Sequence, residues 1–225
     1  MKYKVFLSIG TVLLLFAACT KDNYEPPKSM LNGRVVYQNQ PLGVRSNGVT
    51  LELWQPGYAF FNKITVQVDQ DGTFSASLFD GDYKLTRLKG NGPWVDNTDT
   101  INVSVRGGAN VDVPVDPFFI VKTQNFTRTG TTINATITIQ RVNTTKPLEL
   151  VRVYIGQTLI TDQNNNNANS QKVAADITDI NAPINISVTV PSTLTGKDYA
   201  FLRVGVKTVG VGELLYSTPQ KVALK

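Results

Sequence analysis

The chain has 225 residues, with 22 lysines and arginines against 17 aspartates and glutamates, which gives a formal net charge of +5. It contains no histidine, which excludes Ser-His and Cys-His nucleophile pairs and histidine-ligated zinc sites. The basic side chains are scattered singly rather than gathered in a run or stripe, so we expect no nucleic-acid binding.

The N-terminal segment resembles a bacterial lipoprotein signal. Lys2 and Lys4 precede an apolar run over 5–16, and Cys19, the only cysteine, follows two alanines. The apolar run is shorter than the roughly 20 residues that a membrane-spanning helix needs. We therefore expect a signal peptide over 1–18, cut before Cys19, whose thiol then carries lipid. A signal peptide that is simply removed is the alternative, as is a buried structural cysteine.

Residues 19–29 are polar, charged and proline-containing, and show neither helical nor strand periodicity. This composition predicts a flexible tether between the lipid and the first folded domain. Lys21-Asp22 resembles the short charged signal that sends lipoproteins of Bacteroidota to the outer cell surface, although an ordinary solvated linker would look the same. We expect a lipid-anchored protein of the outer membrane, exposed at the cell surface.

Beyond the tether, apolar and polar side chains alternate with period two, as in 63–68 and 133–139, and β-branched residues dominate. This pattern is typical of strands with one buried and one solvated face. Short segments of this kind, separated by Gly, Asn, Asp and Pro, predict an all-β chain built from antiparallel β-sandwiches. Two prolines at 114 and 117 interrupt strand pairing, so we expect two domains in tandem, at 30–115 and 116–225.

The most specific pattern in the first domain is the segment 71–85. A tight turn with positive φ is predicted at Gly72, and the strand that follows points Phe74 and Leu78 the same way. Together with the opening segment 31–53, this pattern resembles the carboxypeptidase regulatory-like, or transthyretin-like, β-sandwich. The resemblance implies a fold for the first domain and no shared active site.

In the second domain, 198–208 and 214–218 are similar to the last hairpin of an immunoglobulin or fibronectin type III sandwich. Tyr199 stands where such sandwiches often keep a tyrosine. The asparagine-rich segment 164–170 predicts a mobile loop between strands.

The signal, the tether and the two sandwiches together resemble the two-domain uncharacterised lipoproteins that accompany Sus-type glycan uptake systems in Bacteroidota. The activity of that family is not established. The resemblance implies a surface location, a role in glycan handling and contact with an outer-membrane transporter complex, by association rather than by mechanism.

Aromatic residues between strands are candidate sugar contacts, because sugars present apolar C–H faces that stack on exposed rings. We predict a carbohydrate platform centred on the tryptophan of one glycine-rich loop, with contributions from a second loop. The six candidates are Asn91, Trp94, Asp96, Asn97, Trp54 and Tyr58. The alternative is that each tryptophan fills the core or an end of the sandwich.

Aspartates cluster over 69–99, and glycoside hydrolysis needs only two carboxylates. Most of them flank glycine turns, where Asp is favoured for local hydrogen bonds, so we expect no enzyme and no cofactor. Calcium would suit the same oxygens, but no twelve-residue loop with a terminal bidentate Glu is present, and we predict no metal site. Asp99-Thr100-Ile101 resembles a short O-glycosylation signal of Bacteroidota, which makes Thr100 a candidate for modification.

Three functions are compatible with the sequence. A non-catalytic glycan-binding accessory of a polysaccharide uptake system explains the address, the two all-β domains and the aromatic loops. A structural or protein-interaction spacer of a transporter complex explains everything except those loops. A carboxylate-dependent glycoside hydrolase is the third.

Overall fold

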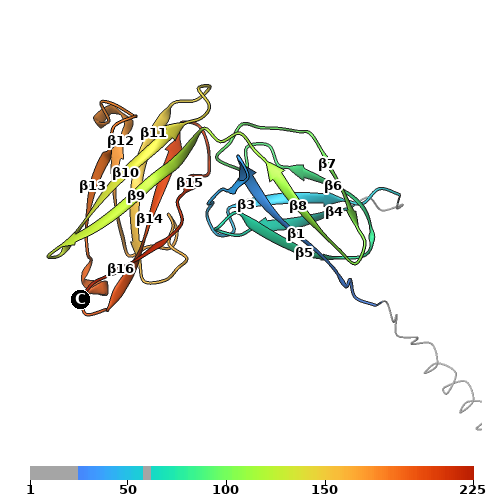
Figure 1. Cartoon of the computed structure of the whole chain (residues 1–225), viewed down its shortest axis with the longest axis horizontal. Coiled ribbons are helices and arrows are strands. Elements are labelled where there is room, and N and C mark those ends of the chain that lie inside the picture. The colour runs from blue at the N-terminus through green and yellow to red at the C-terminus, as the bar shows by residue number, and fades with distance from the viewer. Residues whose placement is uncertain (1–24, 58–61) are drawn as a thin grey trace, which may run out of the picture.

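The computed structural model describes residues 25–57 and 62–225, and this part of the chain is all-β, as predicted (Figure 1). The signal segment and Cys19 lie outside the described residues. Within the described ranges no helix has the length and apolarity to cross a membrane.

The first sandwich contains β1 (Ser29–Tyr37), β2 (Gln40–Pro41), β3 (Val49–Trp54), β4 (Lys63–Val68), β5 (Thr73–Leu78), β6 (Gly81–Arg87), β7 (Ile101–Val105) and β8 (Gly108–Pro114). The second contains β9 (Phe119–Thr129), β10 (Thr132–Arg141), β11 (Leu148–Gly156), β12 (Ala168–Val173), β13 (Ile184–Thr189), β14 (Tyr199–Thr208), β15 (Leu215–Tyr216) and β16 (Gln220–Ala223), with short 3-10 turns at Ala174–Asp176 and Ser192–Leu194.

In the first sandwich, one sheet has β1 at its centre, with β5 and the short β2 on one side and β8 on the other. The facing sheet runs β4-β3-β6-β7. The β1–β8 pair is parallel, unlike the antiparallel pairing that the sequence predicts. Its cause is the turn at 106–107. Strand β7 ends beside the start of β6, and the turn delivers β8 into the other sheet at the end where β1 also begins.

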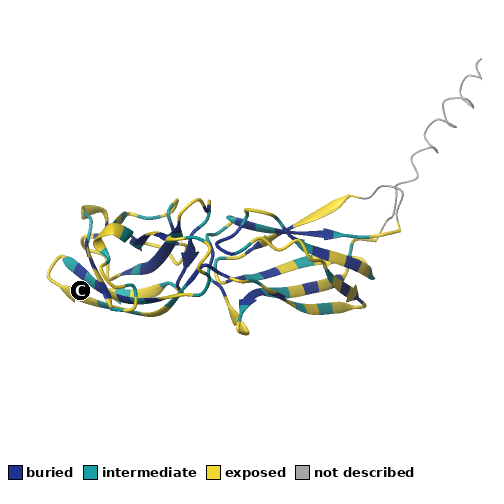
Figure 2. Cartoon of the chain, turned by 90° about the horizontal axis from the view of Figure 1, so that it is seen from above, coloured by how far each residue is buried: buried dark blue, intermediate teal, exposed yellow. Residues whose placement is uncertain are grey.

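The second sandwich packs the sheet β13-β10-β9 on a sheet formed by β12, β11 and β14, with β15 and β16 both paired to β14. Alternation along the strands produces the bands of buried and exposed residues in Figure 2. Buried side chains such as Ile133, Ile137, Val153 and Leu202 form its core.

The structure places both features that the sequence singled out in the second domain. The asparagine-rich segment is folded around Asp162, whose Oδ1 accepts hydrogen bonds from the main-chain N–H groups of Asn164 at 2.8 Å and Asn165 at 3.0 Å, and β12 begins within the segment. Tyr199 is 40% exposed, and the Lys221 ammonium lies 3.7 Å from its ring centroid. It is therefore a surface residue and not a buried corner tyrosine.

The two domains are joined through Arg203, a cation of β14 with no exposed surface. Its Nε donates to the Ser217 carbonyl at 2.8 Å, and its Nη2 donates across the joint to the carbonyls of Val44 at 3.0 Å and Gln70 at 2.7 Å. The guanidinium carbon lies 4.6 Å from the ring centroid of Tyr216. Burial lowers the pKa of Arg203 to about 10, so the side chain stays charged at neutral pH.

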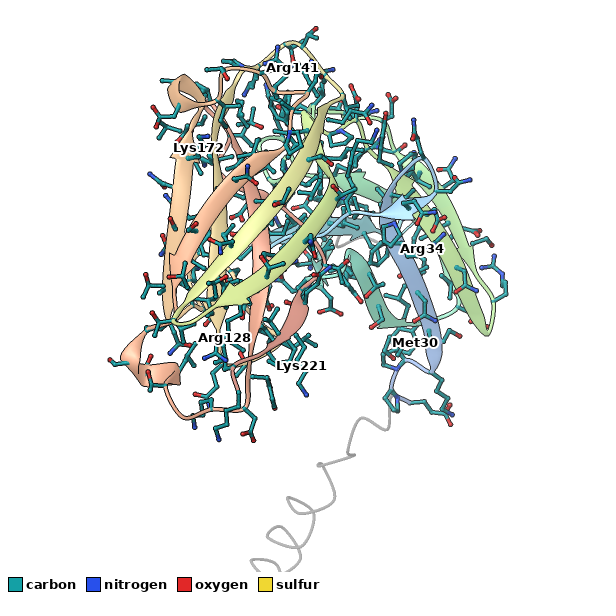
Figure 3. All side chains as sticks on the ribbon, turned by 60° about the vertical axis from the view of Figure 1, so that its left-hand side comes forward. Met30, Arg34, Arg128, Arg141, Lys172 and Lys221 are labelled. Atoms are coloured by element: carbon teal, nitrogen blue, oxygen red, sulfur yellow. The ribbon has the colours of Figure 1, made fainter. Side chains whose placement is uncertain are left out.

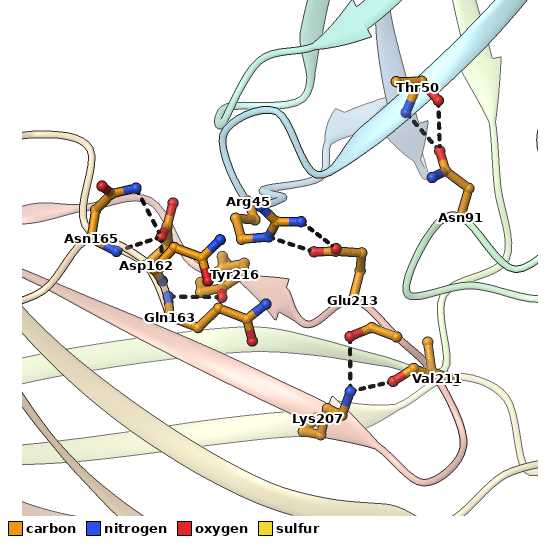
Figure 4. Close-up of polar contacts among 12 residues, drawn as sticks. Arg45, Thr50, Asn91, Asp162, Gln163, Asn165, Lys207, Val211, Glu213 and Tyr216 are labelled. Carbon is orange, nitrogen blue, oxygen red and sulfur yellow. Dashed lines mark hydrogen bonds and ion pairs between the residues drawn. The ribbon is translucent and has the colours of Figure 1, made fainter.

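Other hydrogen bonds also join the two domains, among them the ion pair of Arg45 drawn in Figure 4. Arg45 of the first domain pairs with Glu213 of the second through two hydrogen bonds of 2.6 and 3.0 Å. The Tyr216 N–H donates to the Gly43 carbonyl at 2.9 Å, and Leu215 packs in the core of the first sandwich. Because strands and side chains of one domain complete the other, the two sandwiches form one unit.

We expect Arg203→Met to lower the free energy of unfolding by about 2–5 kcal/mol, because it leaves the buried carbonyls of Val44 and Ser217 without a donor. Urea unfolding followed by tryptophan fluorescence measures this. Arg34→Met is the matched control, since the pair Arg34 forms with Asp112 is about two-fifths exposed and should contribute less than about 1 kcal/mol. Equal unfolding midpoints for the two variants would contradict the role given to Arg203.

Candidate functional site

Trp94, the centre of the predicted platform, is 5% exposed and belongs to the core of the first sandwich. A Cβ on Gly92 would lie 2.2 Å from the indole, so the loop backbone lies directly against the ring. Main-chain pairing with Pro117 also ties Trp94 to the start of the second domain. The structure thus corrects the platform expected here, because a ring so covered offers little surface to a sugar.

The polar partners predicted for Trp94 stabilise the loop itself. The side-chain oxygens of Asn91, Asp96 and Asn97 accept hydrogen bonds from main-chain N–H groups of their own domain, at 2.6, 2.6 and 2.7 Å. Asp96 and Trp94 also line a hollow of about 250 Å³ at the joint, together with Lys146 of the second domain. The loop therefore closes the domain joint, and although Asp96 and Asn97 line another hollow beside Asp116, the Trp94 ring is not part of that surface.

The remaining predicted residues lie elsewhere. Trp54 is half-buried at the end of β3, with Lys63 and Lys84 as its neighbours on the flanking strands. It lies at the opposite end of the sandwich from Trp94. Tyr58 is outside the described residues. Thr100 is exposed just before β7, and its modification stays a prediction.

A hollow of about 760 Å³ lies on the outer face of the sheet formed by β5, β1 and β8. We call it the trough. The residue register places its side chains in rows that cross the three strands. One row consists of Thr73, Arg34 and Asp112. The next row consists of Ser75, Asn32 and Asn110, and Asp69 lies at the margin of the trough.

The floor of the trough depends on Gly33. A Cβ there would lie 2.2 Å from the ring of Phe74 and 2.5 Å from the Val111 carbonyl, so only glycine lets the Phe74 ring pack beneath β1. The turn into β5 has Gly72 at φ +86°, which confirms the predicted positive φ. A Cβ at Gly72 would meet the Leu42 carbonyl at 2.4 Å. These two glycines thus position β5 against β1 at the trough.

An ion pair dominates the electrostatics of the trough. Arg34 donates to Asp112 through Nε at 2.9 Å and Nη2 at 2.5 Å, and these hydrogen bonds lower the pKa of the Asp112 carboxyl. The pair is exposed and holds the two side chains in one plane on the sheet. In the described part of the chain, no three His, Cys, Asp or Glu side chains gather in a way that could hold a metal ion. The trough offers hydroxyl, amide and guanidinium groups, which suit hydrogen bonding to a polyhydroxylated ligand.

The alternation of residues along β5 and β1 predicts this surface, whereas the expected sugar contacts were chosen for their aromatic rings. Since Phe74, Ala76 and Leu78 point inward along β5, the alternating residues Thr73, Ser75 and Ser77 point outward. The same alternation places Asn32 and Arg34 outward on β1. What the sequence does not show is that β8 lies beside β1 and brings Asn110 to the same face.

Comparison with known proteins supplies the family. Residues 29–116 match the N-terminal domain of DUF3823, described as a protein of unknown function, and residues 119–221 match the C-terminal domain DUF3823_C, also of unknown function. The chain belongs to the DUF3823 family. No curated protein matched the sequence.

Solved structures resemble the whole two-domain unit. A DUF3823 protein from Bacteroides ovatus is 38% identical, with a TM-score of 0.82, and one from Parabacteroides merdae is 33% identical, with a TM-score of 0.81. A Bacteroides uniformis protein, described as a candidate carbohydrate-binding protein, is 17% identical with a TM-score of 0.72 and shares the fold. Each comparison covers 88% of this chain and 100% of the other.

We expect Gly33→Ala to destabilise the protein by about 1–3 kcal/mol, because the added methyl group forces the Phe74 ring out of its place beneath β1. Gly212→Ala is the control, because a Cβ there meets nothing within 4 Å, and it should leave stability unchanged or slightly raised. Thermal unfolding of both variants tests this. A Gly33→Ala protein as stable as the parent would show that the packing beneath the trough is loose.

Proposed function

We propose that this DUF3823 protein is a lipid-anchored protein of the outer cell surface that binds glycans in the trough without catalysis, as an accessory of a polysaccharide uptake system. The observation that carries the proposal is the polar trough, with amide and hydroxyl side chains in register across three strands. Amide side chains both donate and accept, so Asn32 and Asn110 match the paired hydroxyls of a sugar.

The comparisons support a sugar as the ligand. The Bacteroides uniformis protein with the same fold is described as a candidate carbohydrate-binding protein. Shared fold is an analogy and not a mechanism, so the trough itself has to be tested. The lipoprotein signal expected at Cys19 supports the location at the cell surface.

Catalysis at the trough is disfavoured by its carboxylates. A glycoside hydrolase needs a general acid whose pKa is raised, and hydrogen bonds from Arg34 lower the pKa of Asp112 instead. The second function we retain is the spacer, because the joint around Arg203 holds the two domains as one unit. A spacer needs a rigid joint and no trough, so mutation of the trough separates the two functions.

We expect Asn32→Ala combined with Asn110→Ala to weaken glycan binding by about tenfold or more, since two paired amides are lost. Affinity electrophoresis of the purified protein in gels containing arabinoxylan, galactomannan, β-glucan or pectin identifies a bound polysaccharide, and calorimetry measures it. Asn134→Ala with Asn185→Ala is the matched control on the outer face of the second domain. If no polysaccharide in such a panel retards the parent protein, the spacer function is favoured.

We expect Cys19→Ser to move the protein from the membrane to the soluble fraction, because the thiol is the predicted site of lipid attachment. Detergent-phase partitioning of cell extracts and protease accessibility on whole cells measure the anchor and the surface exposure. Parent protein that partitions wholly into the aqueous phase would refute the lipid anchor.

A further inference from the structure

The trough ends in two exposed apolar side chains near the tether. Met30 of β1 is 47% exposed, and Phe79, directly after β5, is 51% exposed. Met30 projects from the face that carries the trough, because Leu31 beside it points into the core, and the alternation of β5, continued one residue past Leu78, places Phe79 on the same face. Met30 is paired with Ser77, so Phe79 is its diagonal neighbour, within side-chain reach. We call Met30 and Phe79 the shelf.

The neighbours of the shelf leave it open. On β5 the residue opposite Met30 is Ser77, whose hydroxyl donates to the Pro27 carbonyl at 2.9 Å, and on β8 it is Gly108, which has no side chain. Figure 3 shows Met30 near the start of β1 and Arg34 further along the same strand. From Thr73 to Phe79 the face extends along the strand for roughly 20 Å, which is longer than one sugar ring.

Hydrogen bonds hold the main chain at Phe79 and at the residue that follows it. The Tyr83 hydroxyl donates to the Phe79 carbonyl at 2.9 Å. The next residue, Asp80, accepts hydrogen bonds from the Ser29 hydroxyl at 2.5 Å and from the Gly107 N–H at 2.8 Å. Asp80 therefore fixes the start of β1 and both turns beside Phe79. The main chain at Phe79 is therefore held in place, so binding there needs little ordering of the backbone.

The charges of the trough indicate which glycans fit. Arg34 is already neutralised by its two hydrogen bonds to Asp112, and Asp69 adds a negative charge at the margin. No cation among the trough side chains is left to pair with a uronate or a sulfate group. An uncharged chain has no anionic group that would remain unpaired in the trough. Its hydroxyls can bind the row of Asn32 and Asn110 while one ring lies on the shelf.

We propose that the trough and the shelf together form an extended site for an uncharged polysaccharide chain, with one sugar ring stacked on Phe79 beside Met30 and later sugars hydrogen-bonded to Asn32 and Asn110. The proposal rests on the proposed glycan-binding function and adds the ligand class and the stacking residue. Phe79 is an exposed aromatic residue that lies outside both loops of the predicted platform.

The test is Phe79→Ala in the purified full-length protein, measured by calorimetry against the neutral polysaccharide that the parent binds. We expect binding weaker by about tenfold, and Phe79→Trp to restore it. Tyr199→Ala is the matched control, since this exposed aromatic lies on the second domain, and it should bind like the parent. The variant should fold, because only the Phe79 carbonyl is held by Tyr83 and substitution keeps that carbonyl.

Separate outcomes identify which claim fails. Absence of binding by the parent protein refutes the proposed function. Weak binding after Asn32→Ala but parent-like binding after Phe79→Ala keeps the function and overturns the shelf. Parent binding to pectin or another acidic polysaccharide in preference to neutral chains overturns the ligand class. Loss of binding to phosphatidylethanolamine vesicles on Phe79→Ala, with glycan binding unchanged, would assign the shelf to the lipid surface and overturn the proposal.

Discussion

A buried arginine sets the arrangement of the whole molecule. Arg203 needs hydrogen-bond acceptors for its guanidinium, and the second domain alone provides only part of them; the carbonyls of Val44 and Gln70 complete the set from the first domain. A fully buried cation without these acceptors would be very unfavourable, so separation of the domains is opposed by desolvation as well as by lost packing. The joint therefore keeps the trough at a fixed orientation to the second sandwich.

In the first sandwich, successive residues along a strand face the core and the solvent in turn. Along β1, the residues on one side, such as Leu31 and Val35, build the core, while those on the other side, such as Asn32 and Arg34, meet solvent. A sheet of this kind can change its outer face without loss of stability, because outward side chains contribute little to the core. The outer face and the core are thus encoded by interleaved residues of the same strands.

The sequence predicted the fold class, the turn at Gly72 and the inward side of β5, since each depends on local periodicity or on one backbone conformation. Its exposed ring at Trp94 was wrong, because burial of an aromatic ring depends on tertiary contacts: Trp94 packs against Gly92 and beside the start of the second domain. Arg203 gave no signal either, since an isolated arginine in an apolar strand resembles a surface position until its distant acceptors are known. The parallel pairing of β8 was hidden for the same reason.

The central place of β1 has a mechanical consequence. This strand follows directly on the N-terminal tail, and its residues 30–34 are hydrogen-bonded to β5 on one edge and to β8 on the other. A load applied to the tail acts along the strand axis, so the two ladders resist in shear, with many bonds strained at once rather than opened one after another. Fluid drag on a molecule held at this terminus would thus be borne by the strongest direction of the sheet.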